Sequence, residues 1–283
     1  MTWWRWWLAF AAALPLQAAC NLLTTWGDER SGVDDAPGAI RTTPQVHEGR
    51  VSMRAVLAAA IGCVVASGLL AVPLFAVPSH DGGLAFNWPL VAISLAGLFG
   101  ACNYATGVKF KYRGLGVPFV FFLMGTVEMA GVVCASCLEA LGGLAWLAIL
   151  LVSLPVNCLV AVIMHGNDMR DIPSDRAAGI RTVASVLGPR GALLLYYALH
   201  LLPYAMVACC FRLFVMCRLA FLPQALWALL PLAAFPLTIR TLHTATRVYC
   251  ACPENPPWRG LERASGGIHF VFGLLYALAL ALM

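Results

Sequence analysis

The chain has 283 residues, of which 61% are hydrophobic and 11% are charged, and its mean hydropathy is +0.82. Soluble proteins average about 25% charged residues, so this composition excludes a soluble protein and predicts an integral membrane protein. The net charge is +5. We expect the lipid bilayer to be a partner of the chain, and we expect no nucleic acid.

Apolar stretches recur along the whole chain, and each is long enough, or nearly so, to cross a bilayer as a helix of about 20 residues. The alternating pattern of membrane barrels is absent. We therefore predict an all-α bundle of about eight transmembrane helices that forms a single membrane domain over residues 1–283. The expected spans are Trp4–Trp26, Val51–Val77, Trp88–Gly107, Val117–Ala140, Leu144–His165, Ala192–Phe211, Phe221–Ile239 and Ile268–Met283.

The basic residues lie mostly on one side of this expected bundle. The odd-numbered loops carry 15 of the 18 Lys and Arg residues, and only Arg5, Arg212 and Arg218 fall on the other side. Because loops rich in Lys and Arg stay in the cytoplasm, we expect the odd-numbered loops to be cytoplasmic and both termini to lie outside. The predicted location is the inner membrane of the cell, which the chain crosses several times.

The first expected span runs into a polar motif, CNLLTTWGDERSGVDD, at residues 20–35. Asn21 and Asp28 are seven residues apart, so a continuous helix presents them on one face. Gly27 and Gly32 predict that this helix frays near them, and Asp34 follows in the loop. The same pattern is found in ordinary solvated loops, but a second acidic motif is expected on the same side of the membrane.

The third expected span ends in aromatic and basic residues, with the sequence YATGVKFKYRGLG at residues 104–116. Tyr104, Lys111, Tyr112 and Arg113 all lie in this segment. One interpretation is an aromatic belt with positive-inside charge. The other is capture of a diphosphate by Lys111 and Arg113. Gly114 and Gly116 mark the turn into the next helix.

Glu128 lies about eleven residues into the fourth expected span. An acid at such depth in a membrane helix either takes part in function or is bonded to a neighbouring helix in its protonated form. The sequence leaves both interpretations open.

The most informative motif follows the fifth expected span and reads NDMRDIPSDRAAGIRTVASVLG, at residues 167–188. Pro173 breaks a helix, so we expect one helix to end at Asp171 and a short helix to begin near Pro173. Three carboxylates suit a hard cation such as Mg²⁺, and the neighbouring arginines suit phosphate oxygens. The motif predicts a magnesium–diphosphate site, and the alternative is an Asp–Arg network at a helix end. Its charged residues are Asp168, Arg170, Asp171, Asp175, Arg176 and Arg181.

These three motifs, together with the terminal segment GGIHFVFGLL, resemble the UbiA superfamily of intramembrane prenyltransferases over essentially the whole chain. The likeness is greatest to its 1,4-dihydroxy-2-naphthoate branch, which serves menaquinone biosynthesis. The resemblance implies a ring of helices around a cavity open to lipid. It also implies transfer of a polyprenyl group from prenyl diphosphate to an aromatic acceptor, with Mg²⁺ as cofactor and with decarboxylation of a naphthoate ring.

The same resemblance assigns roles to individual residues. As catalytic residues and metal ligands it implies Asn21, Asp28, Asp171 and Asp175. As substrate-binding residues it implies Asn167, Arg170, Arg176, Lys111, Arg113, Asp34, Tyr104 and Tyr112, the two tyrosines toward the aromatic acceptor.

Two features depart from the family pattern. Thr24 and Thr25 stand where the first motif usually carries Asn-Asp, so the leading carboxylate is missing, and the expected spans number eight rather than nine, as if the leading helix were absent. Three alternatives therefore stay open. They are a related prenyltransferase with another aromatic acceptor, a non-catalytic homologue that binds prenyl diphosphate or quinone, and a transporter. Against the transporter, the charges gather at the cytoplasmic face rather than at the midplane.

Overall fold

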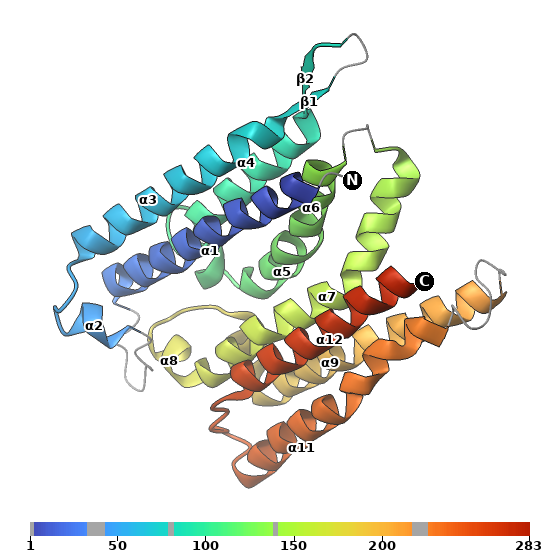
Figure 1. The fold of residues 1–283 in the computed structure, drawn as a ribbon. Coiled ribbons are helices and arrows are strands. Elements are labelled where there is room, and N and C mark those ends of the chain that lie inside the picture. The colour runs from blue at the N-terminus through green and yellow to red at the C-terminus, as the bar shows by residue number, and fades with distance from the viewer. Residues whose placement is uncertain (1–2, 33–42, 79–81, 138–140, 217–225) are drawn as a thin grey trace. The chain divides into compact units, whose positions relative to one another are not determined.

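The computed structural model describes residues 3–32, 43–78, 82–137, 141–216 and 226–283 (Figure 1). The chain forms two compact units, one of residues 1–113 and 126–151 and the other of residues 114–125 and 152–283. Each unit has its own buried apolar cluster.

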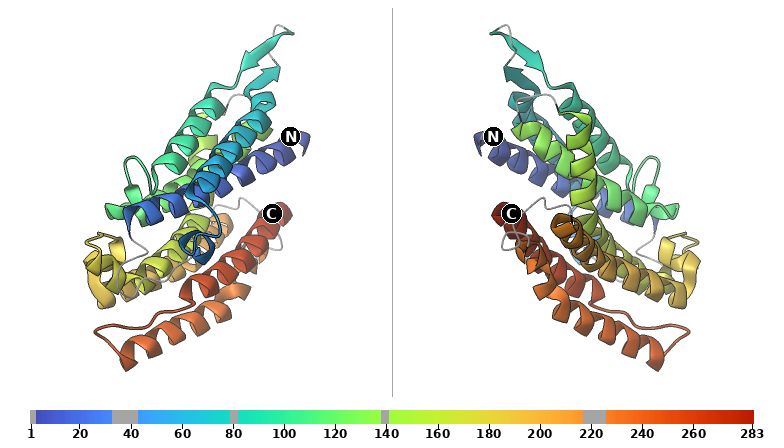
Figure 2. Two further views of the ribbon diagram at one scale, coloured as in Figure 1. Left: turned by 90° about the vertical axis from the view of Figure 1, so that its left-hand side faces the viewer. Right: turned by 90° about the vertical axis from the view of Figure 1, so that its right-hand side faces the viewer.

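The first unit is built around the long helix α1 (Trp3–Ser31), which packs against α3 (Met53–Ala71), α4 (Trp88–Asn103) and α6 (Glu128–Ser136). Figures 1 and 2 show α1 lying alongside α3. Side chains cap two of these helices, because Ser52 Oγ accepts from the Ala55 amide and Asn87 Oδ1 accepts from the Leu90 amide, each at 3.2 Å. Shorter elements complete the unit: α2 (Pro44–His47), η2 (Val72–Phe75) and η3 (Phe110–Tyr112).

A small hairpin interrupts the helical structure of this unit. Strand β1 (Ala76–Pro78) pairs with the antiparallel strand β2 (Leu84–Phe86). The hairpin extends beyond the helices of its unit (Figure 2). The predicted all-α bundle is confirmed apart from this two-stranded ribbon.

Arg5 is almost fully buried in the first unit, with 3% of its surface exposed. Its guanidinium donates to three backbone carbonyls, those of Ala135 at 2.6 Å, Ala76 at 2.9 Å and Leu74. These carbonyls lie at or just beyond the carboxyl ends of other helices, where intrahelical partners run out. Arg5 therefore fastens α1 to three distant points of the chain rather than serving only as a charge at the membrane surface.

The second unit contains α5 (Gly116–Phe121), the carboxyl-terminal part of α7 (Gly143–Arg170) and all elements from α8 onward. A π-helical segment, Phe122–Val127, follows α5 and leads into α6. The core of the unit includes the fully buried side chains of Leu159, Tyr196 and Phe272. The remaining elements are α8 (Ile172–Ala177), α9 (Val183–Met216), η5 (Leu226–Ala234), α11 (Phe235–Ala251) and α12 (Leu261–Leu282).

Seven helical stretches in the described residues are long and apolar enough to cross a membrane, and α4, with 16 residues, is a shorter apolar helix. The predicted multi-pass membrane bundle is confirmed at this level. Several helices extend beyond the predicted apolar spans. Helix α7 continues past His165 to Arg170, α11 continues past Ile239 to Ala251, and α12 begins at Leu261 instead of Ile268, because helices extend through polar turns that an apolar pattern does not include. Residues 221–225 of the seventh expected span lie outside the described residues.

Polar side chains inside the second unit hold the beginning of α12 in place. Tyr196 Oη lies 2.8 Å from Ser265 Oγ and donates to the Leu261 carbonyl at 3.3 Å. His200 Nε2 is 3.3 Å from the same Ser265 hydroxyl. Buried polar groups that satisfy one another in this way specify a single packing arrangement. They fix the first turns of α12 against α9.

Candidate active site

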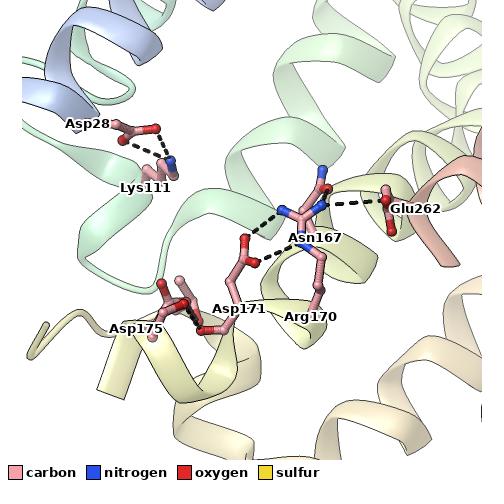
Figure 3. A network of polar contacts seen from close by, with 9 residues as sticks. Asp28, Lys111, Asn167, Arg170, Asp171, Asp175 and Glu262 are labelled. Carbon is pink, nitrogen blue, oxygen red and sulfur yellow. Dashed lines mark hydrogen bonds and ion pairs between the residues drawn. The ribbon is translucent and has the colours of Figure 1, made fainter. Parts of the chain in front are cut away.

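The last turns of α1 bring Asp28 into contact with a basic and an aromatic side chain. Lys111 Nζ lies 2.9 and 2.7 Å from the two oxygens of Asp28, and the Tyr112 hydroxyl donates to the same carboxylate. Asp28 is buried, with 7% of its surface exposed. We call these three residues the Asp28 cluster. Figure 3 shows the carboxylate and the ammonium group facing each other.

The backbone around η3 explains how Lys111 reaches Asp28. The Lys111 amide donates to the Tyr104 carbonyl at 2.9 Å, which closes the loop that follows α4. Lys109 occupies the left-handed region with φ of 59°, which L residues other than Asn and Asp rarely adopt. The loop thus turns back so that Lys111 and Tyr112 both project toward the end of α1.

Gly27 allows this loop to approach α1 closely. A Cβ atom at position 27 would lie 2.6 Å from the Ala105 carbonyl oxygen. That separation is shorter than real Cβ contacts, and a backbone atom cannot yield as a flexible side chain can. Glycine is therefore required beside Asp28 by packing. The expected fraying of the helix near Gly27 is wrong, because α1 continues to Ser31.

We expect Gly27→Ala to lower both stability and activity. Forcing the loop away from α1 costs about 1–3 kcal/mol, as overpacking does elsewhere, and it moves Lys111 and Tyr112 away from Asp28. Thermal unfolding in detergent measures the first effect, and an assay of prenyl transfer, the activity that the resemblance implies, measures the second. The matched control is Gly62→Ala in α3, where nothing lies within 4 Å of the added Cβ. Equal behaviour of the two variants would contradict the packing role of Gly27.

The second group of polar residues lies where α7 ends and α8 begins. Arg170 donates from Nε and Nη2 to the two oxygens of Asp171, each at 2.7 Å. Its Nη1 donates to Asn167 Oδ1 at 3.2 Å and to Glu262 Oε1 at 3.4 Å. We call these four residues the Asp171 cluster. In Figure 3 the guanidinium lies between the carboxylates of Asp171 and Glu262.

The sequence explains the local geometry of this cluster. Arg170 is the last residue of α7, and Asp171 is the N-cap residue of α8, whose second position is Pro173. The predicted break at Asp171 and the predicted short helix are confirmed. Because the chain changes direction at Asp171, its carboxylate can meet the side chain of the residue immediately before it.

Asp175 is held against the beginning of α9. Its carboxylate accepts from Thr182 Oγ1 at 3.0 Å, and 7% of its surface is exposed. Thr182 and Ser185 bond each other's amides reciprocally, at 2.9 and 3.2 Å. Arg176 donates to the Ser185 carbonyl, with the nearer nitrogen at 3.2 Å. Arg176 therefore ties α8 to α9 through a backbone carbonyl.

The remaining predicted site residues differ in their surroundings. Asn21 is exposed on α1 and accepts from Gln17 Nε2 at 3.3 Å. Tyr104 is buried, and Arg113 is exposed. Asp34 lies outside the described residues. Glu128, the acid predicted deep in a span, lies within the apolar helical stretch Gly116–Ser136, where the π-helical segment passes into α6, and its side chain is exposed.

Glu262 and Thr182 are site residues that the sequence did not indicate. Glu262 lies 92 positions from Arg170 and falls in the first turn of α12. The apolar pattern starts that helix at Ile268, which places Glu262 in a connecting loop. An acidic residue just ahead of a glycine-rich membrane span is the signal that could have drawn attention to it.

The oxygen ligands of both clusters suit a hard divalent cation in their chemistry. Both carboxylates, however, are already neutralised by the chain's own basic groups, Lys111 on Asp28 and Arg170 on Asp171. Within the described ranges, no group of three or more His, Cys, Asp or Glu side chains is arranged to hold a metal ion. A cation at either acid must therefore compete with an existing ion pair.

Comparison with known proteins identifies the family. The model of the "UbiA prenyltransferase family" matches residues 1–252. The UbiA prenyltransferase domain-containing protein 1 of Gallus gallus is 31% identical over 195 residues, which cover 68% of this chain and 54% of that protein. The human protein of that name is also 31% identical over 195 residues, or 68% of this chain and 53% of its own length. The Drosophila melanogaster homologue is 28% identical over 269 residues, or 93% of this chain and 65% of its own length.

A solved structure shares the fold. It is the apo structure of a UbiA homolog from Aeropyrum pernix K1, with a TM-score of 0.66 and 20% identity, covering 98% of this chain and 90% of that one. This chain spans about half the length of the Gallus gallus and human relatives. Those relatives are named for the domain and not for an acceptor, so they do not support the narrower assignment to the naphthoate branch. The chain belongs to the UbiA prenyltransferase family.

Proposed function

We propose that the chain transfers a polyprenyl group from prenyl diphosphate to an aromatic acceptor with the help of Mg²⁺. The observation that carries this proposal is the pairing of acids with bases in both clusters, Asp28 with Lys111 and Asp171 with Arg170. A diphosphate bound through divalent cations needs both kinds of group, carboxylates for the cations and basic side chains for the phosphate oxygens. We propose Asp28, Asp171, Asp175 and Asn21 as cation ligands.

The chemistry follows from the charge that develops during the reaction. The bond between the prenyl carbon and the diphosphate oxygen breaks, and its electron pair stays on the diphosphate. Divalent cations bound by the acids would neutralise this leaving group. Arg170 and Lys111 would donate to its oxygens, and their donors gain strength in a water-poor site. A ring carbon of the acceptor then bonds to the allylic carbon, and the ring releases a proton or, from a naphthoate, carbon dioxide.

Our first candidate for the acceptor is 1,4-dihydroxy-2-naphthoate, which would place the reaction in menaquinone biosynthesis. This choice is supported by the likeness of the motifs in the sequence. The other substrate-binding residues proposed from the sequence are Asn167, Arg176, Arg113, Asp34, Tyr104 and Tyr112.

A second candidate function is binding of prenyl diphosphate without transfer. The first motif favours it, because Thr24 and Thr25 stand in place of the usual Asn-Asp and the leading carboxylate is missing. The Thr24 hydroxyl donates to the Cys20 carbonyl at 2.8 Å, and a threonine hydroxyl supplies no negative charge to a cation. The first motif therefore offers fewer charged ligands than the usual family pattern.

The test uses purified protein in lipid nanodiscs with a long-chain prenyl diphosphate and Mg²⁺. In parallel reactions, 1,4-dihydroxy-2-naphthoate or 4-hydroxybenzoate is the acceptor, and products are identified by mass spectrometry. We expect a prenylated naphthoquinol precursor that disappears with EDTA and returns with added Mg²⁺. Product from 4-hydroxybenzoate alone would show that the naphthoate is the wrong acceptor and that a hydroxybenzoate is accepted instead. Binding of the diphosphate without any product would favour the second candidate.

We also propose that the motif loops face the cytoplasm, because the odd-numbered loops hold most of the basic residues. Cys252 is exposed between α11 and α12, on one of these loops. A variant that retains only Cys252 should resist a membrane-impermeant maleimide in intact spheroplasts and react after lysis. Labelling of Cys252 in intact spheroplasts would show that this loop faces outward, which is the reverse of the proposed orientation.

A further inference from the structure

Glu262 belongs to the Asp171 cluster although it lies on the last helix of the chain. Its Oε1 accepts from Arg170 Nη1 at 3.4 Å. Its Oε2 is buried and has no hydrogen-bond partner among the described residues. A buried carboxylate oxygen that lacks a donor is costly, so its presence beside a guanidinium calls for an explanation.

The position of Glu262 is fixed from two sides. A Cβ atom on Gly166 would lie 3.1 Å from the Glu262 amide nitrogen, so the end of α7 and the start of α12 meet backbone to backbone. Tyr196 bonds the Leu261 carbonyl and the Ser265 hydroxyl, on either side of Glu262 along the chain. The carboxylate is thus held beside Arg170 by packing and does not reach it from a mobile loop.

Arg170 in turn divides its donors between two acids. Nε and Nη2 serve Asp171 at 2.7 Å, whereas Nη1 serves Asn167 and Glu262 at the longer distances of 3.2 and 3.4 Å. The ion pair with Asp171 is the stronger one in this arrangement. If Asp171 instead binds a divalent cation, that cation repels the guanidinium, which then needs another carboxylate nearby.

We propose that Glu262 is a positioning residue that retains Arg170 in the cluster when Asp171 binds a divalent cation. Its partnerless Oε2 supplies the acceptor that a shifted guanidinium requires. Arg170 then stays within reach of the diphosphate oxygens and does not return to compete for Asp171. This inference rests on the proposed function, specifically on the cation role of Asp171.

The experiment measures Mn²⁺ binding by electron paramagnetic resonance, with purified protein in nanodiscs and no prenyl diphosphate. Mn²⁺ takes the same oxygen ligands as Mg²⁺. The proteins are the unaltered chain, Arg170→Gln, Glu262→Gln and the double variant. Arg170→Gln should bind Mn²⁺ about tenfold more tightly and Glu262→Gln about tenfold more weakly, a coupling within the range for contacting groups. In the Arg170→Gln background, Glu262→Gln should have little further effect.

The control for loss of one negative charge is Glu254→Gln, whose side chain is exposed in the turn before α12. Its effect on Mn²⁺ binding should be under about twofold, as expected for a screened surface charge. Should Glu262→Gln fail to fold, Glu262→Asp keeps the charge but withdraws it from Arg170, and it should weaken Mn²⁺ binding in the same direction.

Two results would overturn the inference. If Glu262→Gln weakens Mn²⁺ binding equally with and without Arg170, Glu262 acts as a direct ligand or through charge alone. If it changes nothing in the unaltered chain, Glu262 has no part in cation binding. Failure of the proposed function is recognised separately. In that case Asp171→Asn leaves Mn²⁺ binding unchanged, or none of the proteins binds Mn²⁺, and the inference falls with it.

Discussion

Asp171→Asn should reduce prenyl transfer by about 10³-fold in kcat/KM, the loss expected when a preorganised electrostatic stabiliser is removed from an active site. The substitution keeps the shape of the side chain but removes the charge that a cation needs. It also frees Arg170 from its bidentate partner. The prenyl-transfer assay with a saturating acceptor, read together with Mn²⁺ binding, measures both consequences.

The matched control is Glu48→Gln, which removes one partner of an exposed ion pair with Arg50 at 2.6 Å. Such surface pairs contribute little, so activity should stay within about twofold of the unaltered chain. Retention of activity in Asp171→Asn would show that this acid pairs with Arg170 for structural reasons only. In that case the Asp–Arg network at a helix end, the alternative left open by the sequence, would be the correct interpretation.

Arg5→Leu should destabilise the protein by about 3 kcal/mol, because two buried carbonyls and one partly buried carbonyl lose their donor, and each buried loss costs about 1–3 kcal/mol. For a chain of this size the corresponding fall in Tm is roughly 6–12 °C. Thermal unfolding in detergent, followed by intrinsic tryptophan fluorescence, measures it. Arg5→Lys keeps the charge, but a lysine ammonium lacks the planar set of N–H donors of a guanidinium. We therefore expect a Tm between those of Arg5→Leu and the unaltered chain.

Arg54→Leu is the comparison for the loss of an arginine as such, since Arg54 is exposed in the first turn of α3. Its Tm should match that of the unaltered chain within about 2 °C, as surface substitutions do. If Arg5→Leu and Arg54→Leu unfold at the same temperature, the three hydrogen bonds of Arg5 do not stabilise the first unit.

The pattern of residues in the sequence predicted those features of the fold that depend on residues close together along the chain. Pro173 indicated the break after α7, Gly114 and Gly116 indicated the turn into α5, and long apolar runs indicated the membrane helices. Each of these depends on backbone geometry or on hydropathy, which act within a few residues. The Asp–Arg network, which was the alternative interpretation of the motif at residues 167–188, is likewise formed by adjacent residues.

Contacts between distant residues were not predictable in the same way. Lys111 was expected to bind a diphosphate, and the structure pairs it with Asp28, 83 residues away. That pairing depends on the close approach at Gly27, which no periodic pattern encodes. Arg5 was counted as a charge on the outer side because it lies at the start of the first expected span. Its three carbonyl partners come from segments that only tertiary packing brings to α1.

The ion pair between Arg170 and Asp171 joins two consecutive residues, and this has a consequence for biogenesis. As the ribosome delivers the chain to the membrane, the acid at the end of α7 emerges beside its own counterion, so its insertion needs no partner that is still to be synthesised. Glu262 arrives only with α12. The pair can thus be completed as soon as Asp171 is made, and the three-way arrangement of Arg170 forms only after α12 has been synthesised.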